Sequence, residues 1–255
     1  MSKILTTHVG SLPRTQEVVD FIFARENEKP YDQAAFDSCM SEACSETVRK
    51  QVEAGVDIVS DGETSKISYA TYVKDRYTGF SGDSERNAPG DLKLFPGYLK
   101  RLADDGGTPQ YARPKCTGEV KSKGQDELNK DISNLKNAMQ QHGAKRGFMN
   151  AASPGVISLF LQNEYYADRE EYLEALADAM KTEYETIVGA GLDLQLDCPD
   201  LAVDCRALAG AWFIGLVQDA SEGREAERIR LYTAGEVSRC REFLRCGVAV
   251  RQKHE

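Results

Sequence analysis

The spacing of apolar residues alternates along the chain between two patterns. Steps of three and four residues, typical of helices with one buried face, occur over residues 15–25, 32–54, 125–141 and 168–189. Short apolar or β-branched runs lie between them, at 4–7, 57–60, 115–118, 148–151 and 192–196. This alternation of strand and helix predicts an α/β protein whose helices pack on a parallel sheet.

Side chains that can accept hydrogen bonds stand where the longer helices should begin. Thr15 and Asp32 precede two helical stretches, and Asp168 precedes a third, with Glu171 three residues later. Threonine and aspartate satisfy free N–H groups of a first helical turn, and the Asp168–Glu171 spacing resembles a capping box. These residues therefore predict where three helices start.

Residues 52–63 and 188–200 share one pattern. They match in register at a valine, an alanine, a glycine, an aspartate, an aliphatic residue and a second aspartate. A glycine directly after a helix can take the left-handed backbone conformation that ends the helix. A short apolar run and then acids follow each glycine. The pattern predicts two equivalent βα units whose strands end at one functional face.

Recurring βα units up to residue 200 predict a (β/α)8 TIM barrel with a long insertion, residues 64–113, after the second strand. An open doubly wound sheet is the alternative, but no dinucleotide-binding or P-loop glycine motif supports it. The insertion contains Tyr69, Tyr72 and Tyr77. These tyrosines are equally consistent with a functional loop and with a surface subdomain that covers the barrel.

The last part of the chain, residues 205–255, has a different composition. Arginine replaces lysine there, three of the seven cysteines fall in it, and the βα pattern does not recur. A barrel needs about 250 residues in all, so the remainder is too short to complete one that carries a long insertion. We therefore predict an incomplete barrel over 1–204 and a divergent tail, produced by a shifted reading frame or by natural divergence.

Composition narrows the class of protein. The 255 residues are 41% hydrophobic and 29% charged, with a net charge of −9, which is typical of a globular protein and disfavours nucleic acid as a partner. There is no apolar run of about 20 residues and no secretory signal, so we expect a cytoplasmic protein without a membrane partner. The seven cysteines form no CxxC pair, and we expect most of them to be reduced and buried.

Several polar residues fall at or beside predicted strand ends, namely His8, Ser11, Glu63 and Asp197. In a barrel they would converge on one pocket. Two carboxylates bind an ammonium group well, and backbone N–H groups around Gly10 and Ser11 could hold a carboxylate. The set predicts a site for an amino acid or another zwitterion. Surface acids are common, however, and a lone histidine is more often structural than catalytic.

Four motifs resemble the cobalamin-independent methionine synthase family, and most closely its short relatives with only the catalytic C-terminal barrel. They occur in family order at residues 6–14, 57–63, 68–73 and 194–199. The resemblance covers about residues 4 to 204. It implies a (β/α)8 barrel of the methionine synthase/uroporphyrinogen decarboxylase type. It also implies methyl transfer from 5-methyltetrahydrofolate, usually polyglutamylated, to the thiol of homocysteine by a zinc enzyme.

The same resemblance implies roles for individual residues. Gly10 and Ser11 would hold the carboxylate end of homocysteine, and Glu63 and Asp197 would bind its α-amino group. The family's zinc ligands are a His-x-Cys pair, a glutamate and a second cysteine on later strands, and we find no match for them in this chain. Without zinc the transfer should be very slow, because a free thiol with a pKa of about 8.5 is mostly protonated at neutral pH.

Two departures leave alternatives open. Cys198 stands where the full-length synthases carry glutamate, and His8 replaces a smaller residue, so the acceptor could be another small thiol. A second alternative is a truncated, non-catalytic barrel fragment that self-associates through an open sheet edge. Uroporphyrinogen decarboxylase activity would require a basic pocket, and Glu63 and Asp197 argue against it.

Overall fold

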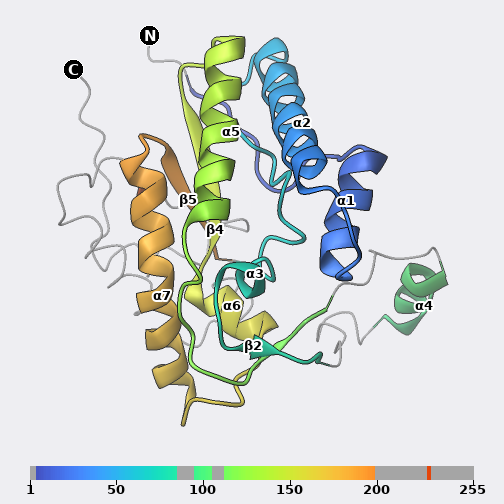
Figure 1. Cartoon of the computed structure of the whole chain (residues 1–255), viewed down its shortest axis with the longest axis vertical. Helices are drawn as coiled ribbons and strands as arrows, with labels where there is room; N and C mark the ends of the chain where they lie inside the picture. Colours follow the sequence, from blue (N-terminus) through green and yellow to red (C-terminus); the bar gives the residue numbers. More distant parts are fainter. Residues whose placement is uncertain (1–3, 85–94, 105–111, 199–228, 231–255) are drawn as a thin grey trace.

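The computed structural model describes residues 4–84, 95–104, 112–198 and 229–230 (Figure 1). Within these residues a parallel sheet has the order β1-β4-β5-β6. Its strands are β1 (Val59–Ser60), β4 (Gly147–Ala152), β5 (Asp193–Asp197) and β6 (Ile229–Arg230). All three neighbouring pairs run parallel. The α/β class and the parallel pairing predicted from the sequence are therefore confirmed for the described residues.

The described residues contain seven helices, and the four longest begin close to the predicted positions. The seven helices are α1 (Gln16–Glu26), α2 (Gln33–Glu53), α3 (Val73–Arg76), α4 (Pro96–Asp104), α5 (Asp126–His142), α6 (Pro154–Phe160) and α7 (Arg169–Gly189). The side chains of Thr15, Asp32 and Asp168 each accept a hydrogen bond from a backbone N–H of the first turn. Glu171 completes the third cap, because its carboxylate accepts from the N–H of Ala167 at 2.9 Å. Local chemistry thus sets these three helix starts.

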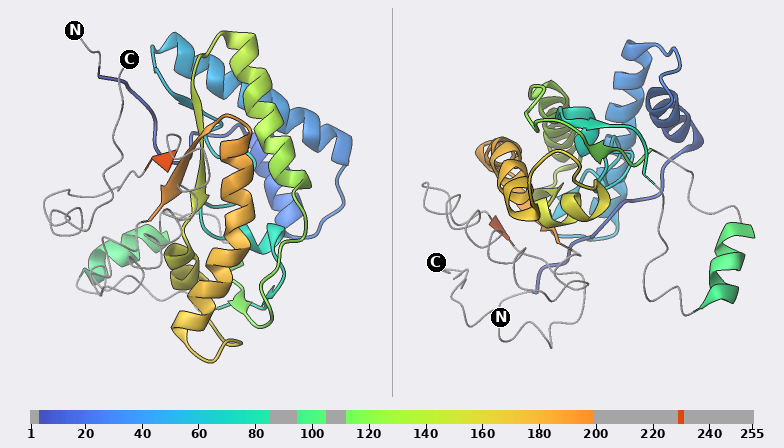
Figure 2. Two further views of the ribbon diagram at one scale, coloured as in Figure 1. Left: turned by 90° about the vertical axis from the view of Figure 1, so that its left-hand side faces the viewer. Right: turned by 90° about the horizontal axis from the view of Figure 1, so that it is seen from below.

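The described long helices lie on one side of the parallel sheet. In the left view of Figure 2, α5 and α7 lie on the same side of β4 and β5, and α2 packs against α5 and β1. Side chains alternate between the two faces of a strand, so the apolar Met149 and Leu194 belong to the core beneath the helices. Asn150 and Gln195, which pair in register, share the opposite face. The polar side of the sheet is therefore the side away from these helices.

The prediction of a first strand over residues 4–7 is wrong in its length. Only Thr7 makes a parallel bridge, to Ile58. The backbone N–H of Thr6 donates to the carboxylate of Asp57 at 2.9 Å, and Ile4 is 90% exposed. A side-chain acceptor thus takes the N–H group that a strand ladder would have used, and pairing is limited to one residue.

The third predicted strand, residues 115–118, belongs to a different sheet. Lys115–Cys116 forms β3, which pairs antiparallel with β2 (Phe80–Ser81) outside the parallel sheet. Gly79 explains this position, since its carbonyl accepts from the N–H groups of Thr117 and Gly118 at 2.8 and 3.2 Å. A Cβ atom on Gly79 would lie 2.6 Å from the Gly118 oxygen, so only glycine permits this approach.

Ser153 directly precedes the short helix α6. Its hydroxyl accepts from the N–H of Val156 at 3.1 Å and caps α6, and Pro154 occupies the first helical position, where proline is well tolerated. In the predicted tail, Ile229–Arg230 continues the parallel sheet as β6. Apart from these two residues, the tail from 205 to 255 lies outside the described residues, as does Pro199 of the fourth motif.

Candidate functional site

A cluster of polar side chains joins the N-terminal loop to the ends of three strands. The side-chain amide of Asn150 donates to Glu63 and, at 2.9 Å, to Asp197. The Ser11 hydroxyl donates to the other carboxylate oxygen of Glu63. The structure therefore brings Ser11, Glu63 and Asp197 together, as the sequence predicts, although the binding roles assigned to them remain predictions.

His8 and Gly10 are placed differently. His8 Nε2 contacts the Gly10 carbonyl oxygen at 2.8 Å, and Gly10 has a φ of 84°. His8 also lines a cavity of about 400 Å³ beside α2 together with Arg14 and Thr47. Among the described residues no hydrogen bond links His8 or Gly10 to either carboxylate. The roles of His8 and Gly10 in ligand binding stay predictions.

An unusual backbone conformation places Glu63 in the cluster. Glu63 has a φ of 57°, and the preceding Gly62 has a φ of 64°. A non-glycine residue in this region costs roughly 1 kcal/mol or more, so other contacts must hold it. Arg14 supplies them, because its guanidinium donates to the carbonyl oxygens of Glu63 at 2.6 Å and Lys66 at 2.7 Å. The geometry of this loop thus depends on a side chain that is 49 residues away in the sequence.

Asn150, Gln195 and Lys66 were not identified as site residues from the sequence. Asn150 and Gln195 are 4% and 1% exposed; Asn150 interrupts an otherwise apolar strand, and Gln195 lies between Leu194 and Leu196. A buried polar residue in a parallel strand normally has specific partners, and this was the available signal. Gln195 Nε2 donates to Asp197 Oδ1 at 2.9 Å. Lys66 donates to the Asn150 carbonyl oxygen at 2.5 Å.

Burial raises the pKa of two aspartates at the cluster. The pKa of Asp197 is raised, chiefly by burial, although the amides of Gln195 and Asn150 and the charge of Lys66 act to lower it. The pKa of Asp61 is raised for the same main reason. Asp61 accepts from the N–H of Glu63 at 3.0 Å and is 4% exposed. It therefore lies beneath the cluster and supports the backbone at Glu63.

A buried ionic network lies next to the cluster, behind Lys66. Arg76 contacts the carboxylates of Asp131 at 2.5 Å and Glu183 at 2.9 Å. The hydroxyls of Tyr72 and Tyr77 also donate to Glu183. These two tyrosines thus act as buried structural residues of the described fold, which favours the covering role over the functional-loop role for them.

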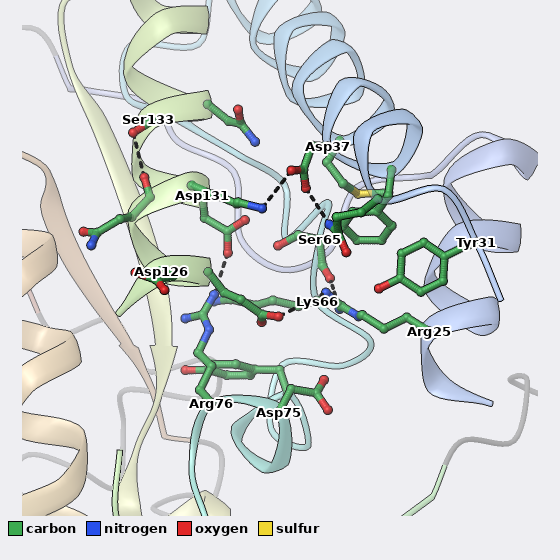
Figure 3. Close-up of a pocket in the computed structure, with 18 residues that line it drawn as sticks. Arg25, Tyr31, Asp37, Ser65, Lys66, Asp75, Arg76, Asp126, Asp131 and Ser133 are labelled. Carbon is green, nitrogen blue, oxygen red and sulfur yellow. Dashed lines mark hydrogen bonds and ion pairs between the residues drawn. The ribbon is translucent and has the colours of Figure 1, made fainter. Parts of the chain in front are cut away.

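The same network forms one wall of a cavity of about 610 Å³ between α1, α2, α5 and the loop before α3 (Figure 3). The labelled arginines in it have partners: Arg76 contacts Asp131, and Arg25 donates to the carbonyl oxygen of Ser65 at 2.8 Å. Lys66 lies at the border between this cavity and the carboxylate cluster. The cavity therefore adjoins the candidate site without containing Glu63 or Asp197.

The described residues do not fit a zinc site. Among them, no group of three or more histidine, cysteine or acidic side chains could hold a metal ion. Cys44, Cys116 and Cys198 are buried, and burial raises the pKa of Cys44, whereas a metal-bound thiol must be deprotonated. Cys205, Cys240, Cys246 and His254 lie outside the described residues.

Comparison with known proteins identifies the relatives of this site. A family model described as "Cobalamin-independent synthase, Catalytic domain" matches residues 4–86, the segment that supplies Ser11 and Glu63. This segment of the chain is therefore similar to the catalytic domain of the cobalamin-independent synthases. It is 25% identical over 239 residues to a methionine synthase of Sulfolobus acidocaldarius and 23% identical over 234 residues to one of Saccharolobus solfataricus.

Solved structures share the fold. A B12-independent methionine synthase from Shewanella sp. W3-18-1, in complex with selenomethionine, matches with a TM-score of 0.65 and 20% identity, covering 89% of this chain and 60% of that one. A putative vitamin-B12-independent methionine synthase from Listeria monocytogenes matches with a TM-score of 0.61 and 18% identity, covering 91% and 66%.

The match covers only part of these synthases. The Sulfolobus and Saccharolobus alignments each cover 91% of this chain but 62% and 63% of the relative's length. None of the helices in the described part of the chain is both long enough and apolar enough to span a bilayer.

Proposed function

We propose that this chain acts as a methionine synthase-like protein that binds homocysteine at the cluster of Ser11, Glu63 and Asp197 and transfers a methyl group to its thiol. The observation that carries the proposal is the pair of hydrogen bonds from Asn150 to Glu63 and Asp197. They hold two carboxylates from separate strand ends close together. Such a pair is expensive to bury unless a cation lies between or beside the carboxylates, which favours an ammonium ligand.

The ligand's orientation follows from the donors and acceptors around it. Glu63 and Asp197 would accept from the α-ammonium group, and the backbone at Gly10 and Ser11 would face its carboxylate. The relatives support this class of ligand, since the Shewanella structure contains selenomethionine, an amino acid with the chalcogen at the same position as the homocysteine sulfur. We propose 5-methyltetrahydrofolate as the methyl donor because residues 4–86 are similar to the catalytic domain of the cobalamin-independent synthases.

For the fold we propose a (β/α)8 barrel of which residues 1–204 form the N-terminal part, with an insertion at 64–113 and a divergent tail at 205–255. The layer of helices on one face of the parallel sheet supports a barrel, because its strands keep their polar residues on the other face (Figure 2). Ile4 and Leu5 precede the bridge between Thr7 and Ile58 at the β1 edge of the sheet, and they are 90% and 44% exposed. Their exposure supports the further proposal that the protein self-associates through this edge.

Thiol activation is the step that the described residues do not explain. In the family zinc would supply it, by binding the thiol as a thiolate. The described side chains here do not offer such a site, so our proposal for them is limited to binding and orienting the amino acid. Methyl transfer by this chain would therefore require thiol activation by groups other than the described side chains.

Isothermal titration calorimetry with L-homocysteine under reducing conditions tests the binding step, and formation of methionine from L-homocysteine and 5-methyltetrahydropteroyltriglutamate tests the transfer. We expect binding that is lost when the ligand is 4-mercaptobutanoate, which lacks the ammonium group. Elemental analysis of the same preparation reports its zinc content. A folded protein that binds neither homocysteine nor methionine would contradict the proposed function.

A further inference from the structure

One buried polar atom at the candidate site has no partner among the described residues. Gln195 lies in the middle of β5, is 1% exposed, and faces the same side of the sheet as its register partner Asn150. Its Nε2 donates to Asp197 Oδ1 at 2.9 Å. Its carbonyl oxygen, Oε1, is buried and accepts no hydrogen bond within the part of the chain that the structure describes.

The orientation of this amide is fixed by its neighbour. If the nitrogen and oxygen were exchanged, Oε1 would face the carboxylate of Asp197, and two acceptors would oppose each other. The atom left without a partner is therefore the acceptor. A buried acceptor without a donor is costly, so a native site that keeps one usually receives a donor from elsewhere.

The missing donor matches the ligand class of the proposed site. An alkylammonium group carries three N–H donors and no acceptor. Glu63 and Asp197 provide two acceptor groups, and the amide nitrogen of Asn150 donates to both of them. A third acceptor group would let each of the three N–H donors of a buried ammonium group have an acceptor group of its own.

We propose that the side-chain carbonyl of Gln195 is the third acceptor for the α-ammonium group of the amino-acid ligand, beside Glu63 and Asp197. This inference rests on the proposed function. It makes Gln195 a ligand-binding residue with two tasks: its nitrogen orients Asp197, and its oxygen contacts the ligand. It also predicts that ligands without an ammonium group do not respond to changes at this oxygen.

The test compares Gln195→Met with wild type for two probes, L-homocysteine and 4-mercaptobutanoate, by calorimetry. Methionine keeps the size of glutamine and removes the acceptor. We expect homocysteine to bind about tenfold more weakly to Gln195→Met, as is usual for one hydrogen bond to a charged group, and 4-mercaptobutanoate to show no binding to either protein. Gln195→Glu, like Gln195→Met, loses the N–H group that donates to Asp197, but it keeps an acceptor oxygen in a side chain of the same shape. We therefore expect its homocysteine affinity at pH 7.5 to fall less than that of Gln195→Met.

The pH of the titration separates the two tasks of Gln195. Its amide lowers the pKa of Asp197. Loss of this effect alone would weaken binding only at acid pH, where Asp197 becomes protonated. We therefore expect the tenfold loss in Gln195→Met to persist at pH 7.5. A loss confined to acid pH would overturn the proposal, because Gln195 would then act only through Asp197.

Other outcomes also decide the question. Arg230 lies in register with Gln195 on β6, so a fall in melting temperature of Gln195→Met with unchanged homocysteine affinity would assign the carbonyl to a contact inside the protein and overturn the proposal. Equal losses in Gln195→Met and Gln195→Glu would overturn it too. If wild type binds neither probe, the proposed function itself fails, whereas binding by wild type with no change in either variant contradicts only the role of Gln195.

Discussion

The two βα units, residues 52–63 and 188–197, are alike up to the end of their strands and differ after it. Gly55 and Gly191 end their helices with φ values of 79° and 85°. The aspartate two residues later ties each strand to its neighbour: Asp57 accepts from the N–H of Thr6 at 2.9 Å, and Asp193 contacts Arg146 at 3.0 Å. The pattern shared by the two sequences therefore produces the same local structure twice.

The acids that match in register then have different environments. Asp197 lies in the carboxylate cluster and accepts from the amides of Asn150 and Gln195. Its counterpart Asp61 lies beneath the cluster and accepts from the N–H of Glu63. In the first unit the acid of the cluster is Glu63, two residues later. The repeated sequence pattern thus predicts where strands end, whereas the backbone conformation after the strand determines which acid reaches the site.

The largest expected effect comes from the residue that joins the two units. Asn150→Leu removes the donor shared by Glu63 and Asp197 and leaves two buried carboxylates facing an apolar group. We expect the free energy of unfolding to fall by about 3 kcal/mol and homocysteine affinity to fall at least about a hundredfold. Urea unfolding and calorimetry measure the two effects.

The matched control for this change is Asn129→Leu, on the exposed surface of α5. We expect it to alter the unfolding free energy by no more than about 0.5 kcal/mol. Asn150→Leu with wild-type affinity for homocysteine would show that the link between the two carboxylates is not needed for binding.

Parts of this structure could be predicted from local patterns. Some features act over only a few residues, so the sequence alone indicates them. These are the helix caps at Thr15, Asp32 and Asp168 and the glycine that ends the helix of each unit. The strand ends carrying Asp61 and Asp197 followed from the same local pattern. These features need no knowledge of the tertiary fold.

The rest depends on contacts between distant segments. The position of β3 follows from a close approach of Gly79 to Gly118, and neither residue indicates the other in the sequence. Asn150 shows only as a polar residue in an apolar strand, and its partners Glu63 and Asp197 are 87 and 47 residues away. The site was therefore predictable as a group of strand ends, but the residue that holds it together was not.

The next comparison exchanges the two acids of the first unit for amides. Glu63→Gln keeps the shape of the side chain and removes the charge that would face the ligand's ammonium group. We expect its homocysteine affinity to fall about thirtyfold. Asp61→Asn keeps an oxygen for the N–H of Glu63, and we expect its affinity to stay within about threefold of wild type. Similar losses in the two variants would contradict the division of roles between Glu63 and Asp61.

The same Asp61→Asn variant should change how stability depends on pH. Burial raises the pKa of Asp61 above its ordinary value of 3.8, so the folded state holds its proton more tightly than the unfolded state. The protein then loses stability as the pH rises from about that value through the folded-state pKa, by about 1.4 kcal/mol for each pH unit that separates the pKa values of the two states. Asparagine does not titrate. We expect the stability of Asp61→Asn relative to wild type to rise between pH 4 and pH 7 in urea unfolding, and a constant difference would contradict the raised pKa.

The smallest effect tests the part in which the two units are alike. Gly55→Ala and Gly191→Ala each place a Cβ atom on a residue with positive φ, and a Cβ at Gly55 would meet no atom within 4 Å, so backbone strain is the cost there. We expect each change to lower the unfolding free energy by about 1 kcal/mol. Gly189→Ala is the control, because Gly189 is the last residue of α7, has no positive φ, and should gain slightly from the helix propensity of alanine. If thermal melting gave losses for Gly55→Ala and Gly191→Ala that differed by more than about 1 kcal/mol, the equivalence of the two helix ends would be wrong, and the shared sequence pattern would not correspond to a shared local energy.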